Sequence, residues 1–578
     1  MALDRRWAQA PAKREQLLLI GQSLDDMVPQ NHPVRVLQTC LELVDWKPWE
    51  KRYASRRGQP PIHPRLMAGC ILYGLIRGLR SSRDLEEATR ERVDFMWFLE
   101  MRSIDHSTFA QFRTQFGEEL KLLNRDIVRQ VCARQEDSLL QFLLDGTRIR
   151  ANSSRHETRT AQGLEKLIAQ CAEELDRKLA RLQETDAQAQ EQEKGPSLQA
   201  EVAQLQSEVE TLRKQADAYR KALEIAQARD AVRKAHNGNK AKAVQVPLAD
   251  PDAQVTPNKE GGFAPNYTPV AGVDAATRMI VSQDVLEGSD ENASVLPAVE
   301  AAEECTGKKV QQVLADGNFA GGANLEALEQ RGTEAYMPTG AGTDPANPVL
   351  RADLGQPVSE EQWGVIPKHG KYFSAAAFVY DACQNCYYCP MGKMLTPAHD
   401  ATDRNGARYT LFRCPGAAGC PLASQCVRGK ASARTLRRGE HQEVRERTAA
   451  RMATQEGKAV FAKRAPIMEG VFGEIKHILG VRQFLLRGLE KVRIEWNWIC
   501  GAFNLKRWMN LLLQEQARKE PDGGASKQSG NELNPLPVQQ KLLRTAHLAH
   551  GDRVWSAVNH EKEPDTKLYG CSYRRLAA

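Results

Sequence analysis

The chain has 578 residues, a formal net charge of +7, and 26% charged residues. This length is enough for two to four domains with cores of their own. The modest excess of Lys and Arg permits a nucleic-acid partner without establishing one. No run of about 18 apolar residues occurs, and the first residues lack the apolar segment of a secretory signal. These features predict a cytoplasmic protein with no membrane span.

Residues 1–137 have the apolar spacing of a helical domain. Within it, residues 103–117 predict a helix that follows the N-cap candidates Ser107 and Thr108 and presents Arg113 outward. A helix of this kind can read a DNA groove. The alternative is the ordinary surface of a helical bundle.

Residues 138–159 and 236–340 predict a mixed sheet flanked by helices, because strands, a hairpin and a helix alternate along them. Two predicted buried strands end in an acid, at Asp145 and at Asp316. An unpaired carboxylate at the end of a buried strand is costly, but it suits a site for a cation. For Asp145 the alternative is a simple Asp-Gly turn. Asp274 also precedes a turn, and its place in a hairpin explains it structurally.

Residues 160–235 interrupt this pattern with a segment rich in Ala, Gln, Glu, Lys and Leu. Its apolar residues alternate spacings of four and three, which is the seam of a coiled coil. Gly195 and Pro196 divide the segment into two helices. We expect a helical hairpin that either folds on itself or pairs with a second subunit.

Six of the 13 cysteines lie between residues 383 and 426, inside the segment 341–440. C-x-x-C repeats followed by further cysteines are typical of a tetrahedral zinc ribbon. Such a site would be structural, because four thiolates leave no position for a substrate. The alternative is a set of reduced cysteines without metal. The candidates are Cys383, Cys386, Cys389, Cys414, Cys420 and Cys426.

Residues 441–515 predict helices, and residues 516–578 a poorly ordered tail. On one of these helices Glu469 and Lys476 share a face, two turns apart. An acid and a lysine in this arrangement can present a carboxylate to a metal and an ammonium to a phosphate. The alternative is an amphipathic core helix with solvated charges.

Four pieces of the chain together resemble one family. They are GQPPIHPRLMAGCILYGLIRGLRSSRDLEEA at 58–88, LDGTRIRANSS at 144–154, LADGNFAGGANLEAL at 314–328 and MEGVFGEIKHILGVRQFLLRG at 468–488. In order and spacing they resemble the bacterial insertion-sequence transposases with an RNase-H-like core and a DDE triad, most of all the eleven-eighty-two group. The resemblance implies an α/β protein whose RNase-H-like mixed sheet is flanked by helices. We also expect an N-terminal all-helical domain, an inserted coiled-coil hairpin and a zinc-ribbon-like insertion.

The resemblance implies that Asp145, Asp316 and Glu469 are the catalytic carboxylates. They would hold two Mg²⁺ or Mn²⁺ ions, which prefer oxygen ligands and support in-line phosphoryl displacement. Water would attack a phosphodiester at the end of the element, and the freed 3′-OH would attack target DNA. The implied partners are double-stranded DNA, as terminal inverted repeats and target, and further copies of the chain in at least a dimer.

Basic residues near the glutamate helix and on the N-terminal helices are candidates for DNA contacts: Lys476, Arg464, Arg113, Arg482, Lys506 and Arg507. Many relatives carry Tyr, Arg, Glu and Lys in a fixed signature around this helix. Here Phe461 stands in place of the tyrosine, and four residues rather than three separate Arg464 from Glu469. This departure leaves the role of Arg464 open.

Among the cysteines the resemblance favours Cys389, Cys414, Cys420 and Cys426 as zinc ligands. Family members tend to place two residues between the first two cysteines of the later group, whereas five separate Cys414 from Cys420. Cys386 is therefore an alternative to Cys414. Two other functions remain beside transposition: a catalytically silent DNA-binding regulator that keeps the fold, and a metal-dependent nuclease without strand transfer.

Overall fold

The computed structural model describes residues 23–53, 61–191, 196–237, 242–257, 261–288, 290–340, 346–403, 406–429 and 431–519. The chain divides into two compact units, Met1–Ala517 and Arg518–Ala578. Nearly all described residues belong to the first unit. The predicted tail lies outside the described residues from residue 520 onward.

The described part of the N-terminal segment is helical, as predicted. Its elements are α1 (Pro33–Glu42), α2 (Lys47–Glu50), η1 (Lys51–Tyr53), α3 (Pro64–Ile76), α4 (Ser82–Glu91), α5 (Val93–Phe98), α6 (His106–Gln115) and α7 (Gly117–Cys132). Helix α3 is buried almost from end to end and forms the centre of this group. The N-cap of α6 is Asp105, whose carboxylate accepts a hydrogen bond from the Ser107 amide. The prediction of Ser107 or Thr108 as the cap was therefore wrong, because an aspartate two residues earlier satisfies the free amide.

A seven-stranded mixed sheet follows these helices. Its strands are β1 (Gln141–Gly146), β2 (Ile149–Arg150), β5 (Gln254–Pro257), β6 (Phe263–Asp274), β7 (Ile280–Leu286), β8 (Gln312–Leu314) and β9 (Glu334–Tyr336). The main path runs β2-β6-β1-β8-β9, and β5 and β7 also pair with β6. Strand β1 is antiparallel to β6 and parallel to β8, and β8 is parallel to β9.

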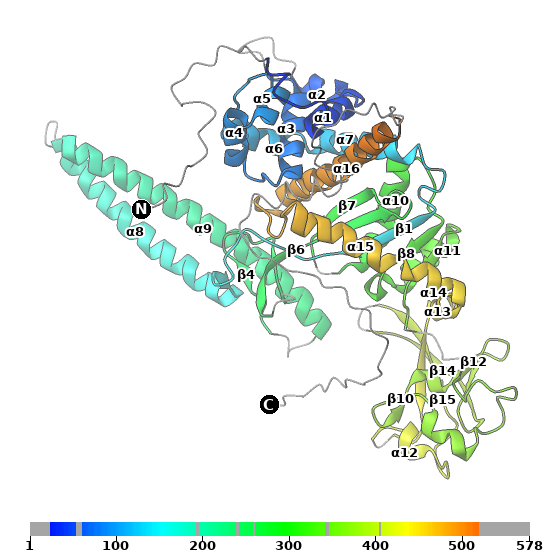
Figure 1. The fold of residues 1–578 in the computed structure, drawn as a ribbon. Helices are drawn as coiled ribbons and strands as arrows, with labels where there is room; N and C mark the ends of the chain where they lie inside the picture. The colour runs from blue at the N-terminus through cyan, green and yellow to red at the C-terminus, as the bar shows by residue number, and fades with distance from the viewer. Residues whose placement is uncertain are drawn as a thin grey trace, which may run out of the picture. The chain divides into compact units, whose positions relative to one another are not determined.

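Helices cover the sheet, and the alternation of side chains along β1 separates two cores. Phe142 and Leu144 pack with α10 (Val295–Thr306) and α11 (Gly322–Gln330). Leu143 packs with Leu314 of β8 and with the helices near the end of the described chain. Figure 1 shows these helices, in orange, beside the sheet. Odd-numbered positions of β1 therefore point toward those later helices.

These later helices are α13 (Gln442–Ala453), α14 (Gln455–Ala462), α15 (Arg464–Gly473) and α16 (Leu489–Lys519). A single π-helical turn, η7 (Glu474–Ile478), continues α15. Helix α15 packs against β1, and Trp496 of α16 is fully buried in the same core. Isolated π turns often occur at functional sites.

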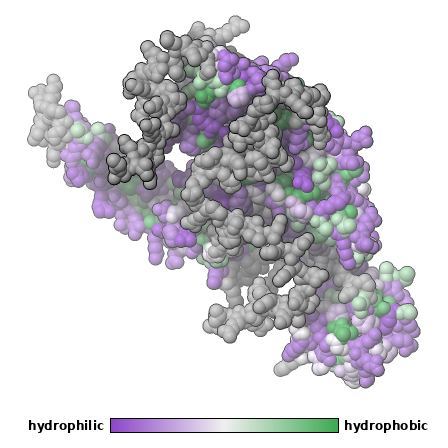
Figure 2. Space-filling view, viewed as in Figure 1, coloured by the Kyte–Doolittle hydropathy of each residue, from purple (hydrophilic) through white to green (hydrophobic). Residues whose placement is uncertain are grey.

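Helices α8 (Ala161–Glu191) and α9 (Pro196–Asn237) form the predicted hairpin and pack against each other. Ion pairs join Lys178 to Glu208 and Arg181 to Glu201, which fixes an antiparallel arrangement. The two helices thus pack on each other within one chain, and pairing with a second subunit stays a prediction. On the face shown in Figure 2, hydrophilic residues predominate along it.

The hairpin begins and ends at one small antiparallel ladder. Strand β3 (Thr158–Arg159), just before α8, pairs with β4 (Val246–Pro247), just after α9. Beyond β4, Asp250 accepts a hydrogen bond from the Gly488 amide and Asp252 one from the Leu489 amide. The base of the hairpin is thus attached to the first turn of α16.

The cysteine-rich segment contains its own antiparallel sheet, in the order β12-β13-β14-β15-β16. Its elements are η5 (Glu360–Val365), the pair β10 (Lys368–His369) and β11 (Tyr372–Phe373), η6 (Ala375–Ala377), β12 (Val379–Asp381), β13 (Cys386–Tyr388), β14 (Met394–Thr402), β15 (Arg408–Arg413), α12 (Ala423–Cys426) and β16 (Thr435–Gly439). In the described residues, no helix is both long enough and apolar enough to cross a membrane.

Candidate active site

Two of the predicted carboxylates meet at one edge of the sheet. Leu143 of β1 lies opposite Leu314 of β8 in a parallel register, so Asp145 and Asp316 each follow two residues beyond that pair. Because side chains alternate along a strand, both acids point to the face that α15 covers. The parallel neighbours therefore bring together residues that are far apart in the sequence.

Arg464, at the start of α15, lies between these two acids. Its Nη2 is 2.9 Å from Asp145 Oδ1 and 3.8 Å from Asp316 Oδ2. The arginine side chain is only 14% exposed, and its Nε is buried without a hydrogen-bond partner. One cationic nitrogen thus lies close to two carboxylates. The attraction between opposite charges is strongest at such short distances.

Backbone amides hold both carboxylates in place. Asp316 caps the short helix η4 (Gly317–Phe319), and its Oδ1 accepts a hydrogen bond from the Asn318 amide. Asp145 Oδ1 accepts one from the Gly146 amide.

Glu469 lies on α15, five residues after Arg464, and is exposed. Five residues of α-helix rise about 7.5 Å along the axis. Glu469 therefore lies farther along the axis of α15 than Arg464, the residue of this helix that contacts both aspartates. Within the part of the chain that the structure describes, no three of these acids have oxygens mutually within 4.8 Å.

Lys476 lies in the π turn η7 and contacts the end of β1. Its Nζ donates a hydrogen bond to Thr147 Oγ1 over 2.5 Å. Thr147 is two residues beyond Asp145, so Arg464 and Lys476 fix both ends of this helical segment to the end of one strand. Glu469 lies between the two attachments.

A fourth acid, Glu291, lies beside Asp145 and Asp316 and was missed by the sequence analysis. Burial raises the pKa of Glu291, and the charges of Asp316 and Asp145 raise it further. Glu291 follows β7 in a polar stretch with no predicted strand end of its own. The sheet topology explains its position. Strands β7 and β1 are both antiparallel to β6, so they run in the same direction and end at the same edge of the sheet.

The rival acid Asp274 is structural, as interpreted from its turn. It is fully buried and pairs in register with Phe142, at the end of β1 opposite to Asp145. Its carboxylate accepts hydrogen bonds from the Leu139 amide and from the amide and hydroxyl of Thr277.

Three of the predicted DNA-contacting residues are engaged inside the protein. Arg113 donates to the Arg80 carbonyl, its Nε and Nη2 are buried, and burial lowers its pKa. Arg507 donates to the Thr277 carbonyl. Lys506 forms an ion pair with Glu474 over 2.7 Å. Each of these side chains thus has a partner within the protein, and their contacts to DNA stay a prediction.

By contrast, Arg482 is exposed and lies beside the π turn, where Nη2 is 2.9 Å from His477 Nδ1. Together with Lys476 it places positive charge on the segment that carries Glu469. Phosphate contacts need charge of this kind on an accessible surface.

Four of the six clustered cysteines line one small cavity: Cys389, Cys414, Cys420 and Cys426. Cys389 Sγ accepts hydrogen bonds from the amides of Met391 and Lys393, each over 3.3 Å. Cys386 is buried on β13 away from this cavity, and Cys383 is exposed. Cys414 thus lines the cavity and Cys386 does not, and the wider spacing after Cys414 lies in the loop before α12.

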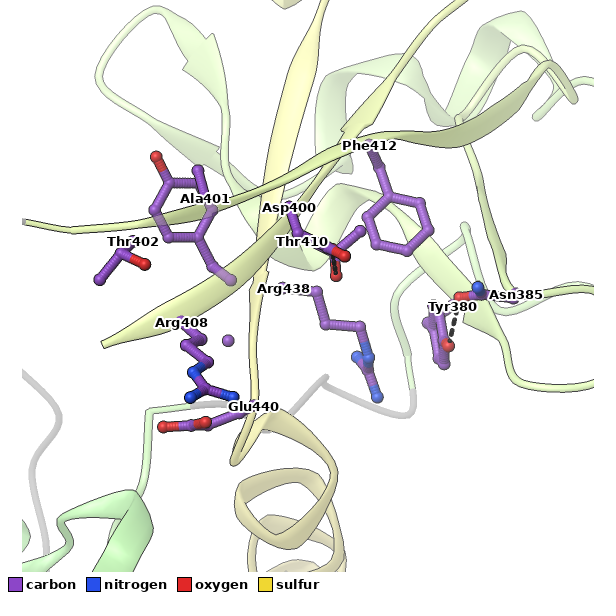
Figure 3. Close-up of a pocket in the computed structure, with 12 residues that line it drawn as sticks. Tyr380, Asn385, Asp400, Ala401, Thr402, Arg408, Thr410, Phe412, Arg438 and Glu440 are labelled. Carbon is purple, nitrogen blue, oxygen red and sulfur yellow. Dashed lines mark hydrogen bonds between the residues drawn. The ribbon is translucent and has the colours of Figure 1, made fainter. Parts of the chain in front are cut away.

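A pocket of about 520 Å³, separate from the carboxylates, lies on the sheet of the cysteine-rich segment. Figure 3 shows Arg408 and Arg438 among its lining residues. Arg438 is already paired with both oxygens of Glu446 and stacked on Tyr380. This internal pairing leaves the pocket without a clear chemical role.

Two segments of the chain match known families. Residues 22–115 match the Transposase domain (DUF772), and residues 388–509 match the Transposase DDE domain. The second match covers Glu469, Lys476 and the four cavity cysteines but not Asp145 or Asp316. No curated protein and no solved structure matches the chain at a significant level.

The two matches define the class of the protein: it is a transposase, an enzyme that acts on DNA. More particularly, it is a DDE transposase of the insertion-sequence kind, a group of metal-dependent enzymes that cut and transfer DNA. The mixed α/β structure agrees with this class.

Proposed function

We propose that the protein cleaves the ends of its own insertion sequence and joins the 3′-OH to target DNA by two-metal-ion phosphoryl transfer. The proposed core is RNase-H-like. The sheet supports this: three antiparallel strands in the order β7-β6-β1 continue into the parallel strands β8 and β9.

One observation carries the proposal: Asp145 and Asp316 share a single cationic nitrogen from the helix that also bears Glu469. Two carboxylates close enough to share one positive group can also share a divalent cation. Oxygen donors of this kind fit Mg²⁺ and Mn²⁺. When bound, such ions supply activation of the attacking water and stabilisation of the leaving oxygen.

In this proposal the residues of the chain have separate roles. Asp145, Asp316 and Glu469 would hold the ions, and α15 would have to move to bring Glu469 to the two aspartates, because the three carboxylates are not within reach of one ion in this structure. Lys476 and Arg482 contact DNA phosphates beside the site, and Thr147 orients the lysine. Arg464 pairs with the aspartates and turns to a phosphate when the ions occupy their positions.

We also propose that the four cavity cysteines hold one structural Zn²⁺. Their shared cavity supports this, as do the two amide donors on Cys389, which partly offset the burial that raises the pKa of its thiol. Among the described cysteines, no three sulfurs lie mutually within 4.8 Å. Closing the site around the ion would therefore require the sulfurs to move toward one another.

The partners proposed are double-stranded DNA, as the terminal inverted repeats and the target, and a second copy of the chain.

The test uses DNA carrying one element end, with Mg²⁺ or Mn²⁺. The wild type should release a 3′-OH end and join it to target DNA. Asp145→Asn and Asp316→Asn should bind the DNA but neither cleave nor join it.

Asp217→Asn on the exposed surface of α9 is the matched control and should act like the wild type. Cleavage by Asp145→Asn at the wild-type rate would refute the site. Binding without any cleavage by the wild type would instead favour a silent DNA-binding regulator. Cleavage without joined product would identify a nuclease.

A further inference from the structure

The sheet of the cysteine-rich segment has two different faces. In β15, Phe412 is buried in the local core together with Leu436 of β16, which lies opposite it in register. Side chains alternate along a strand, so Leu411 and Arg413 point to the other side. Neither Leu411 nor Tyr409 is part of the core. We call this other side of β14, β15 and β16 the outer face.

The antiparallel register arranges the outer face in three rows of residues. Each row runs from β14 through β15 to β16, and the rows are Thr396, Arg413 and Thr435; His399, Leu411 and Arg437; and Ala401, Tyr409 and Gly439. Neighbours within a row have Cβ atoms about 4.5–5.5 Å apart. The outer face therefore gathers two arginines, a histidine and a tyrosine in a small area, and none of its rows contains a carboxylate.

The two arginines of the outer face are exposed, and neither forms an ion pair with an acid among the described residues. Arg437 lies over the Tyr409 ring, with its Cζ 4.8 Å from the ring centroid. This contact holds the guanidinium in place through its flat face and leaves its edge available to an acceptor. Arg413 has a long hydrogen bond from Nη2 to Ser432 Oγ, over 3.4 Å.

Charged groups on the opposite side of the same strands are already paired. Arg438 binds both oxygens of Glu446. Asp400 accepts a hydrogen bond from the Thr410 hydroxyl over 2.7 Å. Between residues 393 and 439 the chain has nine Lys and Arg residues, two Asp and no Glu. The segment thus has an excess of positive charge, and the outer face presents part of that charge to solvent.

We propose that the outer face binds the phosphate backbone of duplex DNA. Arg413 and Arg437 donate to phosphate oxygens, and the hydroxyls of Thr396 and Thr435 supply further donors. Because no row contains a carboxylate, nothing within the rows repels a polyanion. The inference goes beyond the proposed function, in which the cysteine-rich segment only holds zinc, but rests on it for DNA as the partner.

The experiment measures binding of the full chain to a fluorescein-labelled duplex of random sequence. Fluorescence anisotropy is recorded over a series of NaCl concentrations, without Mg²⁺ or Mn²⁺. The double variant Arg413→Gln/Arg437→Gln should reduce the steepness of log Kd against log salt by roughly two and weaken binding at low salt roughly tenfold or more. Arg408→Gln is the matched control, because Arg408 is exposed on β15 but lies on the opposite side, in the pocket described above. It should keep the wild-type salt dependence.

A wild-type salt dependence in the double variant would overturn the inference. Arg482→Gln separates this outcome from failure of the proposed function, because it removes a proposed phosphate contact beside the carboxylates. If Arg482→Gln weakens binding and the double variant does not, only the inference falls; a wild type that binds no DNA would refute both.

Circular dichroism of each variant reports folding. If the double variant does not fold, Thr435→Glu decides, because it adds a negative charge beside Arg413 on the outer face. Thr402→Glu adds the same charge on the opposite side and is its control. Thr435→Glu should bind DNA more weakly than Thr402→Glu, and equal affinity would overturn the inference.

Discussion

Glu495 of α16 joins the N-terminal helices to the loop that follows the π turn. Its carboxylate accepts hydrogen bonds from the amides of Leu485 and Leu486 and pairs with Arg80 over 3.3 Å. Arg80 also donates to the carbonyls of Gly480 and Gln483. Both charged side chains are shielded, at 16% exposed for Arg80 and 13% for Glu495.

Glu495→Ala removes the acceptor of two amides and leaves the positive charge of Arg80 without its partner. Breaking a buried pair in this way costs about 3–5 kcal/mol. Since about 1.4 kcal/mol corresponds to a factor of ten, a local loss of about 3 kcal/mol should speed amide exchange roughly a hundredfold.

The assay is hydrogen–deuterium exchange on peptides that contain residues 479–488, which needs no global two-state transition. Glu515→Ala is the control, because its pair with Arg134 lies on the same helix but is 41–45% exposed. Exposed pairs contribute about 1 kcal/mol or less. Exchange at Leu485 and Leu486 that is no faster in Glu495→Ala than in Glu515→Ala would refute the reasoning.

Four further predictions follow from other parts of the structure. Cys414→Ser should lose bound zinc by elemental analysis whereas Cys386→Ala should retain it; equal zinc content would contradict the ligand set. Gly272→Ala should lower stability to urea by about 1–3 kcal/mol, because a Cβ would lie 2.3 Å from Phe142 Cζ; an unchanged midpoint would argue against this packing. Asp274→Ala should cost about 2 kcal/mol or more through its lost amide bonds, yet leave Mn²⁺ affinity unchanged; weakened metal binding would give Asp274 a role at the site. Glu208→Gln should cost less than about 1 kcal/mol of hairpin stability by thermal circular dichroism, and a larger loss would show that the Lys178 pair matters more than its exposure suggests.

The sequence predicts the elements of the fold well where hydrophobic patterning is strong. The buried runs ending at Asp145 and Asp316 are strands, and four residues of the predicted α9 seam, Leu205, Val209, Ala216 and Ala226, are buried. The register of β1 with β8 depends on long-range pairing. Hence the meeting of the two aspartates could be expected only through the family resemblance.

The sequence did not reveal which charged side chains are buried or which groups they bind. Arg113 and Arg507 read as basic surface residues, but tertiary packing turns each toward an internal carbonyl. Glu291 was missed for a similar reason, because only the return of the chain after β7 brings it beside Gly146. A pattern of charges along the sequence does not specify which of them face inward.

The ladder between β3 and β4 has a practical consequence for engineering the enzyme. The chain enters and leaves the hairpin through adjacent, hydrogen-bonded residues. The two ends that an inserted domain would have to join are therefore close together, whatever the length of α8 and α9. A compact reporter domain whose own termini lie close together should be accepted in exchange for α8 and α9. The transposase would then carry a tag in place of the hairpin, with the loss of the hydrogen bonds that Arg229 of α9 donates to the Pro251, Asp252 and Ala253 carbonyls.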